Sequence, residues 1–181
     1  MSRTEADAWA AGSAFTEPVF HVTASVSAAA IRRVGFDLGY LQFGRAFGDG
    51  VYMTPSSLVA SRYERMFRNS GVAAEILELR IDLRHLLTVH QPSGSGTDVV
   101  TRILNAIPAG LSRYVEQIVR LTPTGLDAVA QARALSLVVS AAGYDALHVI
   151  DEGFTPRIGG TQIVVWDPKR IVVIHEEPAT T

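Results

Sequence analysis

The sequence predicts an α+β fold, because strand-like segments occupy both ends of the chain and a helical block lies between them. Segments of strand composition recur up to residue 90 and again after residue 143, whereas residues 97–142 carry apolar side chains at helical spacing. With 181 residues, 48% of them hydrophobic, the chain can bury a full core. We therefore expect one domain over residues 1–181, with residues 1–17 as an N-terminal extension and residues 97–142 as the helical block.

The first half of the chain alternates between strand and helix patterns. Strands are predicted at residues 18–23, 50–53 and 73–83, with residues 86–90 continuing the last of them. Helices are predicted at residues 25–36 and 56–69. Ser25 or Ser27 should cap the first helix and Gly35 should end it, while Pro55 suits the first turn of the second. The glycine-rich and aromatic segment 37–50 fits neither periodic template and is expected to be a loop.

The second half begins with the helical block and returns to strands. Helices are predicted at residues 99–107, 110–121 and 126–142, and strands at residues 146–150, 162–166 and 170–174. A tight turn at residues 167–169, shaped by Asp167, separates the last two strands. The helical block should pack its apolar positions against the sheet, with a regulatory helix or a partner surface as the alternative; these positions are Ile103, Ile107, Leu111, Val115, Ile118 and Leu121.

Composition excludes several classes of site. The net charge is −2 and no run of Lys or Arg forms a stripe, so the sequence does not predict a strong electrostatic grip on nucleic acid. The absence of cysteine excludes disulfides, cysteine nucleophiles and thiolate metal sites. No metal is expected, because the histidines outside the first strand lack metal-ligand spacing; they are His85, His90, His148 and His175. The N-terminus resembles neither a signal peptide nor a membrane anchor, so we expect a cytoplasmic protein, or one delivered without a classical signal, and no membrane partner.

Two tyrosines suggest a slot for a planar ligand. Tyr52 leaves a short strand, and Tyr63 lies eleven residues later, in the helix that follows. Eleven residues are close to three helical turns, so the two rings could face one flat molecule from different elements.

The order of the segments resembles the ADP-ribosyltransferase superfamily, and within it the branch of diphtheria-type toxins and poly(ADP-ribose) polymerases. The likeness rests on FHVT, AAAIRRVGF, FGRAFGDGVYMT, a helix ending in RY, a long strand, GYDAL and TQIVVWDP, in this order. It covers roughly residues 18–90 and 143–175. The resemblance implies a split β-sheet, part mixed and part antiparallel, with flanking helices, and it makes residues 97–142 a helical insertion.

The resemblance also implies a site for NAD. It assigns the three residues that hold and activate NAD to His21, Tyr52 and Gln162. Thr23 matches a hydroxyl residue near the adenosine ribose, and Tyr63 matches the second wall of a nicotinamide slot. The main chain of Val22 would hold the nicotinamide amide, and Arg45 could reach a pyrophosphate oxygen, although an ordinary exposed arginine is the simpler reading. The glycine-rich stretch around Arg45 is no phosphate loop, because it precedes a strand instead of opening a helix.

Gln162 departs from the glutamate that is usual in this branch. A neutral amide stabilises the positive charge of an oxocarbenium-like transition state less well than a carboxylate does. We therefore expect transfer of a single ADP-ribose, at a slow rate or not at all. Asp151 or Glu152, just before the loop that leads into the Gln162 strand, could supply an acid. In that loop Phe154 and Arg157 are the candidates for acceptor recognition. A solvated glycine-rich loop is the competing interpretation.

These residues lead to a functional expectation. The chain is expected to be a mono-ADP-ribosyltransferase that uses NAD as co-substrate and modifies a macromolecular acceptor, protein or nucleic acid. The resemblance fits a bacterial toxin, effector or defence protein with a neutralising partner. Two alternatives stay open: a catalytically weak or inactive module that binds NAD or ADP-ribose, and an enzyme that modifies a small molecule such as an antibiotic.

Overall fold

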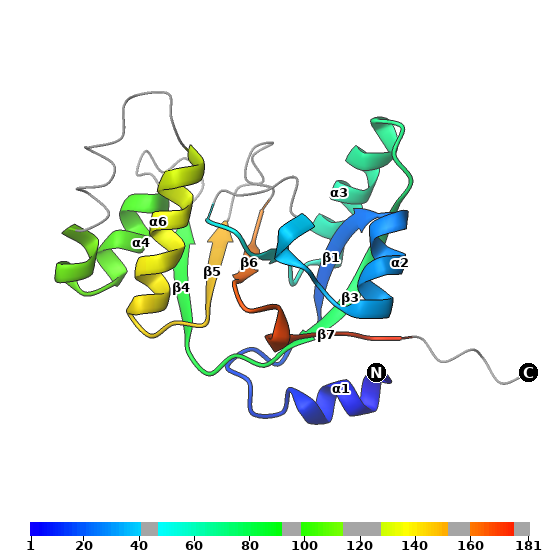
Figure 1. Ribbon diagram of the computed structural model, residues 1–181, viewed down its shortest axis with the longest axis horizontal. Coiled ribbons are helices and arrows are strands. Elements are labelled where there is room, and N and C mark those ends of the chain that lie inside the picture. The colour runs from blue at the N-terminus through cyan, green and yellow to red at the C-terminus, as the bar shows by residue number, and fades with distance from the viewer. Residues whose placement is uncertain (41–46, 92–98, 114–127, 152–159, 176–181) are drawn as a thin grey trace, which may run out of the picture.

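A computed structural model describes residues 1–40, 47–91, 99–113, 128–151 and 160–175 (Figure 1). Within these residues the strands form two sheets. The first is antiparallel, in the order β1 (Val19–Ala24), β3 (Ala74–Ile81) and β7 (Ile171–Val173). The second has the order β2 (Val51–Met53), β6 (Gln162–Val165), β5 (Ala146–Asp151) and β4 (Leu86–Gln91), and its β4–β5 pair is parallel. The predicted α+β fold with a split, part mixed and part antiparallel sheet is confirmed.

The helices flank these sheets. They are α1 (Arg3–Trp9), α2 (Ser25–Val34), α3 (Ser57–Asn69), α4 (Val99–Ala106) and α6 (Ala128–Ala141), with short 3₁₀ turns at η1 (Leu38–Tyr40) and η2 (Pro168–Arg170). Figure 1 shows α4 and α6 beside the second sheet, α2 and α3 beside the first, and α1 below it. No helix in the described parts of the chain is long and apolar enough to cross a lipid bilayer.

Two core clusters follow from the strand alternation. The first joins both sheets to α2 and includes Val19, Ala28, Leu77, Leu79, Met53, Ile163 and Val165. The second fills the space between the second sheet and the helices α4 and α6, and includes Leu87, Ile103, Leu135, Val139, Leu147 and Val164. The helical block therefore packs against the sheet as predicted, through Ile103, Ile107 and Leu111; the other three predicted positions lie outside the described residues.

Two predicted helix starts are wrong. Helix α2 begins directly at Ser25, and its N-cap is Ala24, without a side-chain cap. The Ser25 N–H instead donates to the carbonyl of Ala73, so neighbouring backbone replaces the predicted serine cap. In α3 the cap is Ser56, whose hydroxyl accepts from the Val59 N–H at 3.3 Å. Pro55 therefore precedes the cap instead of lying in the first turn.

The chain crosses between the sheets where the sequence suggested simple continuation. Residues 86–90 do not extend β3 but form β4 in the other sheet, and the turn after β6 leads into β7 of the first sheet. Asp145 bonds to the segments that make both crossovers, the one before β4 and the one before β7. Its carboxylate accepts from the N–H groups of Arg84 and His85, at 2.7 and 3.0 Å, and pairs with Arg170 at 3.0 Å.

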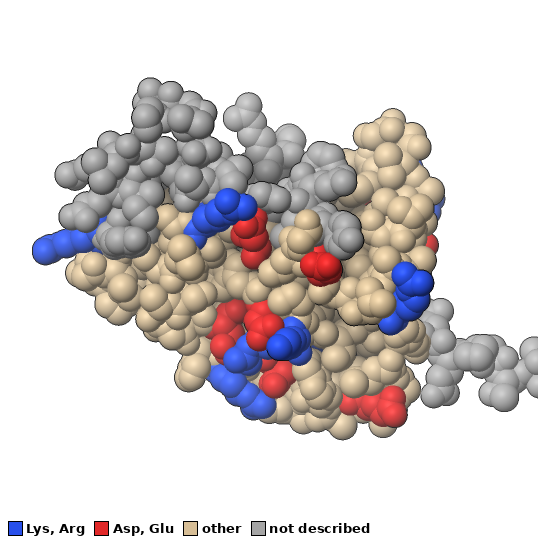
Figure 2. Space-filling view, viewed as in Figure 1, with Lys and Arg blue, Asp and Glu red and all other residues tan. Residues whose placement is uncertain are grey.

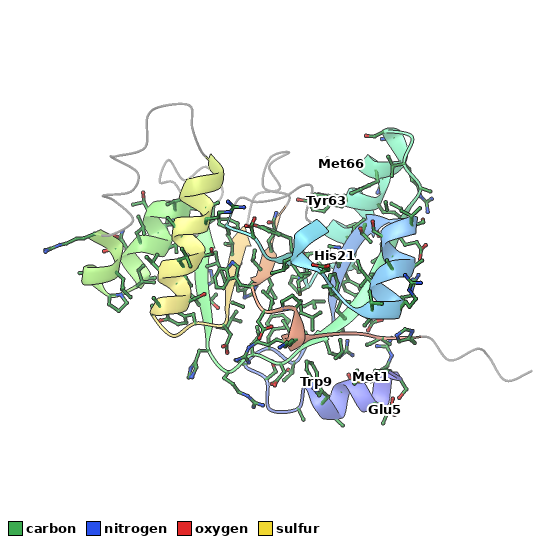
Figure 3. The ribbon with its side chains drawn as sticks, viewed as in Figure 1. Met1, Glu5, Trp9, His21, Tyr63 and Met66 are labelled. Carbon is green, nitrogen blue, oxygen red and sulfur yellow. The ribbon has the colours of Figure 1, made fainter. Side chains whose placement is uncertain are left out.

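Helix α1 was not among the predicted elements. Ser2 and Glu5 form a reciprocal capping box, which the motif S-x-x-E in the sequence would have indicated. The helix buries Ala6 completely and pairs Asp7 with the buried guanidinium of Arg80 at 2.6 Å. Figure 3 shows the side of α1 that carries Trp9 lying under the first sheet. The N-terminal segment is thereby part of the fold's packing.

The docking of α1 predicts a matched pair of substitutions. Ala6→Leu should lower the free energy of unfolding by about 1–3 kcal/mol, because the added atoms have no space at a fully buried position. Ala8→Leu, at an exposed position of the same helix, should change it by less than about 0.5 kcal/mol. Urea unfolding measures both values. Equal effects of the two substitutions would mean that α1 is not docked through Ala6.

Candidate functional site

The candidate site lies where the two sheets part. Phe20 of β1 and Thr54, directly after β2, form an antiparallel bridge: the Phe20 N–H donates to the Thr54 carbonyl at 2.8 Å, and the Thr54 N–H donates back at 3.0 Å. A continuous ladder would next pair Val22 with Tyr52, two residues further along each strand. No such pair is formed in the described structure, so β1 and β2 separate at this point.

His21 fills the start of the gap. Its Nδ1 lies 2.8 Å from the main-chain carbonyl of Tyr52, which can only accept, so Nδ1 carries the proton and Nε2 keeps its lone pair. The ring packs edge-on against Phe36, with centroids 5.1 Å apart. Burial lowers the pKa of His21 more than the bond to Tyr52 raises it, so the imidazole is neutral at pH 7.

Val22 presents an open peptide edge to the same gap. Phe20 directs both its N–H and its C=O toward Thr54, away from β3. Successive residues of a strand point these groups to alternate sides, so those of Val22 also point away from β3 and into the gap. Among the described residues no backbone bond reaches Val22 from across the split. Within the described part of the chain, one donor and one acceptor therefore lie side by side without a backbone partner.

Gln162 and Tyr63 are hydrogen-bonded to each other. The Gln162 side-chain Nε2 donates to the Tyr63 hydroxyl at 3.3 Å, which leaves the amide Oε1 as an acceptor. Both side chains are half-buried, and burial raises the pKa of Tyr63, so its phenol stays neutral. Residues 162 and 63 come from β6 and α3, and the structure thus brings together two of the predicted site residues.

Tyr52 has a different environment. Its hydroxyl accepts from the Phe47 N–H at 2.7 Å and donates to the Gly48 carbonyl at 2.9 Å. Its ring stacks on Phe47, with 6.5 Å between centroids, and packs against the second core cluster. The two predicted walls of the slot are therefore engaged differently, Tyr63 with Gln162 and Tyr52 with the turn at residues 47–50.

The turn at residues 47–50 is held by α6 and by Trp166, which sequence reasoning did not identify. Trp166 donates from Nε1 to the Phe47 carbonyl at 3.1 Å, and Arg133 of α6 pairs with Asp49 at 2.8 Å. Gly48 has φ +95°, and a Cβ there would come within 2.6 Å of the Ser136 side chain. The glycine is required both by its conformation and by the close approach of α6.

The remaining predicted site residues are only partly described. Thr23 lies on β1, half-buried, two residues beyond His21 and on the same side of the strand. Arg45, Phe154 and Arg157 lie outside the described residues, as does Glu152.

Other kinds of site find no support in the described parts of the chain. Those residues contain no group of three or more His, Cys, Asp or Glu side chains that could hold a metal ion. His148 is buried and packs against the edge of Phe15, in keeping with the structural role expected for it. On the face seen in Figure 2, the coloured basic and acidic side chains are interspersed.

No protein-family model and no curated protein sequence matches the chain. Among solved structures, it is similar to a chain in the crystal structure of the M. tuberculosis MbcT–MbcA toxin–antitoxin complex, with a TM-score of 0.43 and 14% identity. The match covers 88% of this chain and 81% of the other.

The geometry of His21 predicts its tautomer. At pH 7 the ring should be neutral with the proton on Nδ1, because Tyr52 offers only an acceptor and burial disfavours the charged form. Two-bond ¹⁵N–¹H correlation spectra of the imidazole distinguish the two tautomers. A proton on Nε2, or a ring still charged at pH 7, would contradict the assignment.

Proposed function

We propose that the protein is an enzyme that cleaves NAD and transfers a single ADP-ribose to a macromolecular acceptor, protein or nucleic acid. The observation that carries this proposal is the peptide edge of Val22, which lies beyond the Phe20–Thr54 bridge where β1 and β2 separate. The hydrogen-bonded pair of Gln162 and Tyr63 supports it. A toxin, effector or defence protein with a neutralising partner is the biological setting that we propose for such an activity.

The open edge suits a primary carboxamide. The nicotinamide group of NAD carries one carbonyl and one NH₂ on the same carbon, so it can accept from the Val22 N–H and donate to the Val22 C=O. This pairing replaces the missing ladder bonds of the split sheet. Tyr63 would cover one face of the pyridinium ring, and such ring contacts contribute about 0.5–1.5 kcal/mol beyond the buried area.

The reaction requires cleavage of one bond and formation of another. The bond between the nicotinamide nitrogen and the ribose C1′ breaks, and its electron pair leaves with neutral nicotinamide. A lone pair of the acceptor then bonds to C1′, and the acceptor loses a proton. Positive charge develops on the ribose in between, so groups that orient the sugar and accept hydrogen bonds from its hydroxyls lower the barrier.

Gln162 and His21 are the side chains that we assign to the ribose parts of NAD. The Oε1 of Gln162 would accept from a hydroxyl of the nicotinamide ribose, while its Nε2 stays on Tyr63. The unprotonated Nε2 of His21 is an acceptor for another sugar hydroxyl. Tyr52 contributes through its carbonyl, which fixes the His21 ring.

A second candidate is an NAD-binding module without turnover. The neutral amide at position 162 favours it, because no negative charge at this position stabilises the developing cation. Both candidates bind NAD, and only the enzyme releases nicotinamide.

Release of nicotinamide from NAD therefore tests the proposal. The wild-type protein should release it slowly, and faster when a cell lysate supplies the acceptor. Gln162→Glu should raise the rate at least about tenfold, since a carboxylate stabilises the ribosyl cation. The control Asn69→Asp adds the same charge at the exposed end of α3 and should leave the rate unchanged. Binding of NAD without release by either the wild type or Gln162→Glu would replace the enzyme by the binding module.

A further inference from the structure

We propose that His21 is a positioning residue that keeps the sheet open at the candidate site. Its imidazole occupies the hydrogen-bond acceptor that Val22 would otherwise use to continue the ladder between β1 and β2. The inference concerns the free protein, and only its consequence for ligand binding rests on the proposed function.

The register of the bridge identifies the competing pair. Phe20 and Thr54 exchange both of their backbone hydrogen bonds, at 2.8 and 3.0 Å. In an antiparallel ladder the next pair of this kind lies two residues away on each strand, which is Val22 opposite Tyr52. In that pair the Val22 N–H would donate to the Tyr52 carbonyl. The His21 Nδ1 donates to this same carbonyl at 2.8 Å.

Packing holds the imidazole in place. The main chain of His21 is fixed by its pairing with Leu77 of β3, and the edge contact with Phe36 supports the ring. The ring therefore stands between the two strands where they would otherwise approach to about 4.8 Å. The side-chain bond also offsets the loss of one ladder bond, since a buried carbonyl without a hydrogen-bond donor is destabilising.

The open peptide edge of Val22 therefore depends on the side chain at position 21. A residue at position 21 without a suitable donor would remove this hydrogen bond from the Tyr52 carbonyl. The nearest replacement donor is the N–H of Val22, two residues after Phe20 on β1. Closure would then satisfy both strands and remove the donor and acceptor of Val22 from the gap. A primary carboxamide, the ligand class that needs both groups at once, would lose its place.

Two substitutions of His21 separate the donor from the ring. In His21→Asn the side-chain nitrogen stands as many bonds from Cα as Nδ1 does, so the donor to Tyr52 is kept. In His21→Val the donor is lost, and a β-branched residue favours the strand. His21→Gln places its donor one methylene further from the main chain than Nδ1. It replaces His21→Val as the variant without a donor to Tyr52 if His21→Val does not fold.

Backbone amide exchange of Val22, measured by NMR without any ligand, is the primary readout. It should be fast in the wild type and in His21→Asn, and slower by at least about tenfold in His21→Val and His21→Gln. A new cross-peak between the amide protons of Val22 and Tyr52 should accompany the slowing. Fast exchange in every variant, or equal slowing in His21→Asn and His21→Val, would overturn the proposal.

A second arm links the edge to the ligand. NAD should bind His21→Asn more tightly than His21→Val by at least about tenfold, because only the first keeps Val22 open. If the wild type fails to bind NAD, the proposed function falls, while the exchange of Val22 still decides whether His21 holds the sheet apart. If the exchange data show that His21 keeps the sheet open but NAD binds both variants equally, the link between the open edge and the ligand is wrong.

Discussion

The hydrogen bond between His21 and the Tyr52 carbonyl is the interaction on which the candidate site depends. The two sheets are joined by the bridge between Phe20 and Thr54. Backbone pairing alone would extend this ladder between β1 and β2 to Val22 and Tyr52. The imidazole lies 2.8 Å from the next acceptor, the Tyr52 carbonyl, and among the described residues no backbone hydrogen bond reaches Val22 from across the split. A split sheet thereby becomes a place where a ligand can supply the missing hydrogen bonds.

The rest of the fold holds this opening in position. Asp145 ties together the crossovers that carry the chain from one sheet to the other, and α3 places Tyr63 against Gln162. Helix α6 fixes the turn at residues 47–50 through the ion pair of Arg133 with Asp49. The Tyr52 hydroxyl of β2 hydrogen-bonds to the backbone of the same turn. The described part of the helical block thus supports the strand that orients His21, in addition to covering the second core cluster.

Sequence periodicity and capping rules predicted the features that depend on neighbouring residues. The α+β class, the strands and the Gly35 helix end follow from patterns within a few residues, and Gly35 indeed has φ +83°. The Ser25 cap failed because a distant carbonyl, that of Ala73, satisfies the helix start. The bond from Tyr52 to the turn and the contact between Gln162 and Tyr63 depend on which strands become neighbours, which no local pattern encodes. Helix α1, by contrast, could have been found from its capping box.

In the proposed function, the open edge of Val22 receives a primary carboxamide. The most direct measurement is a titration of ¹⁵N-labelled protein with NAD and with its nicotinic acid analogue, in which a carboxylate replaces the amide, while the Val22 amide resonance is followed. NAD should cause a large shift of the Val22 resonance, and the analogue should bind at least about tenfold more weakly, because a carboxylate cannot donate to the Val22 carbonyl. Equal binding of the two compounds, or binding of NAD that leaves Val22 unperturbed, would contradict it.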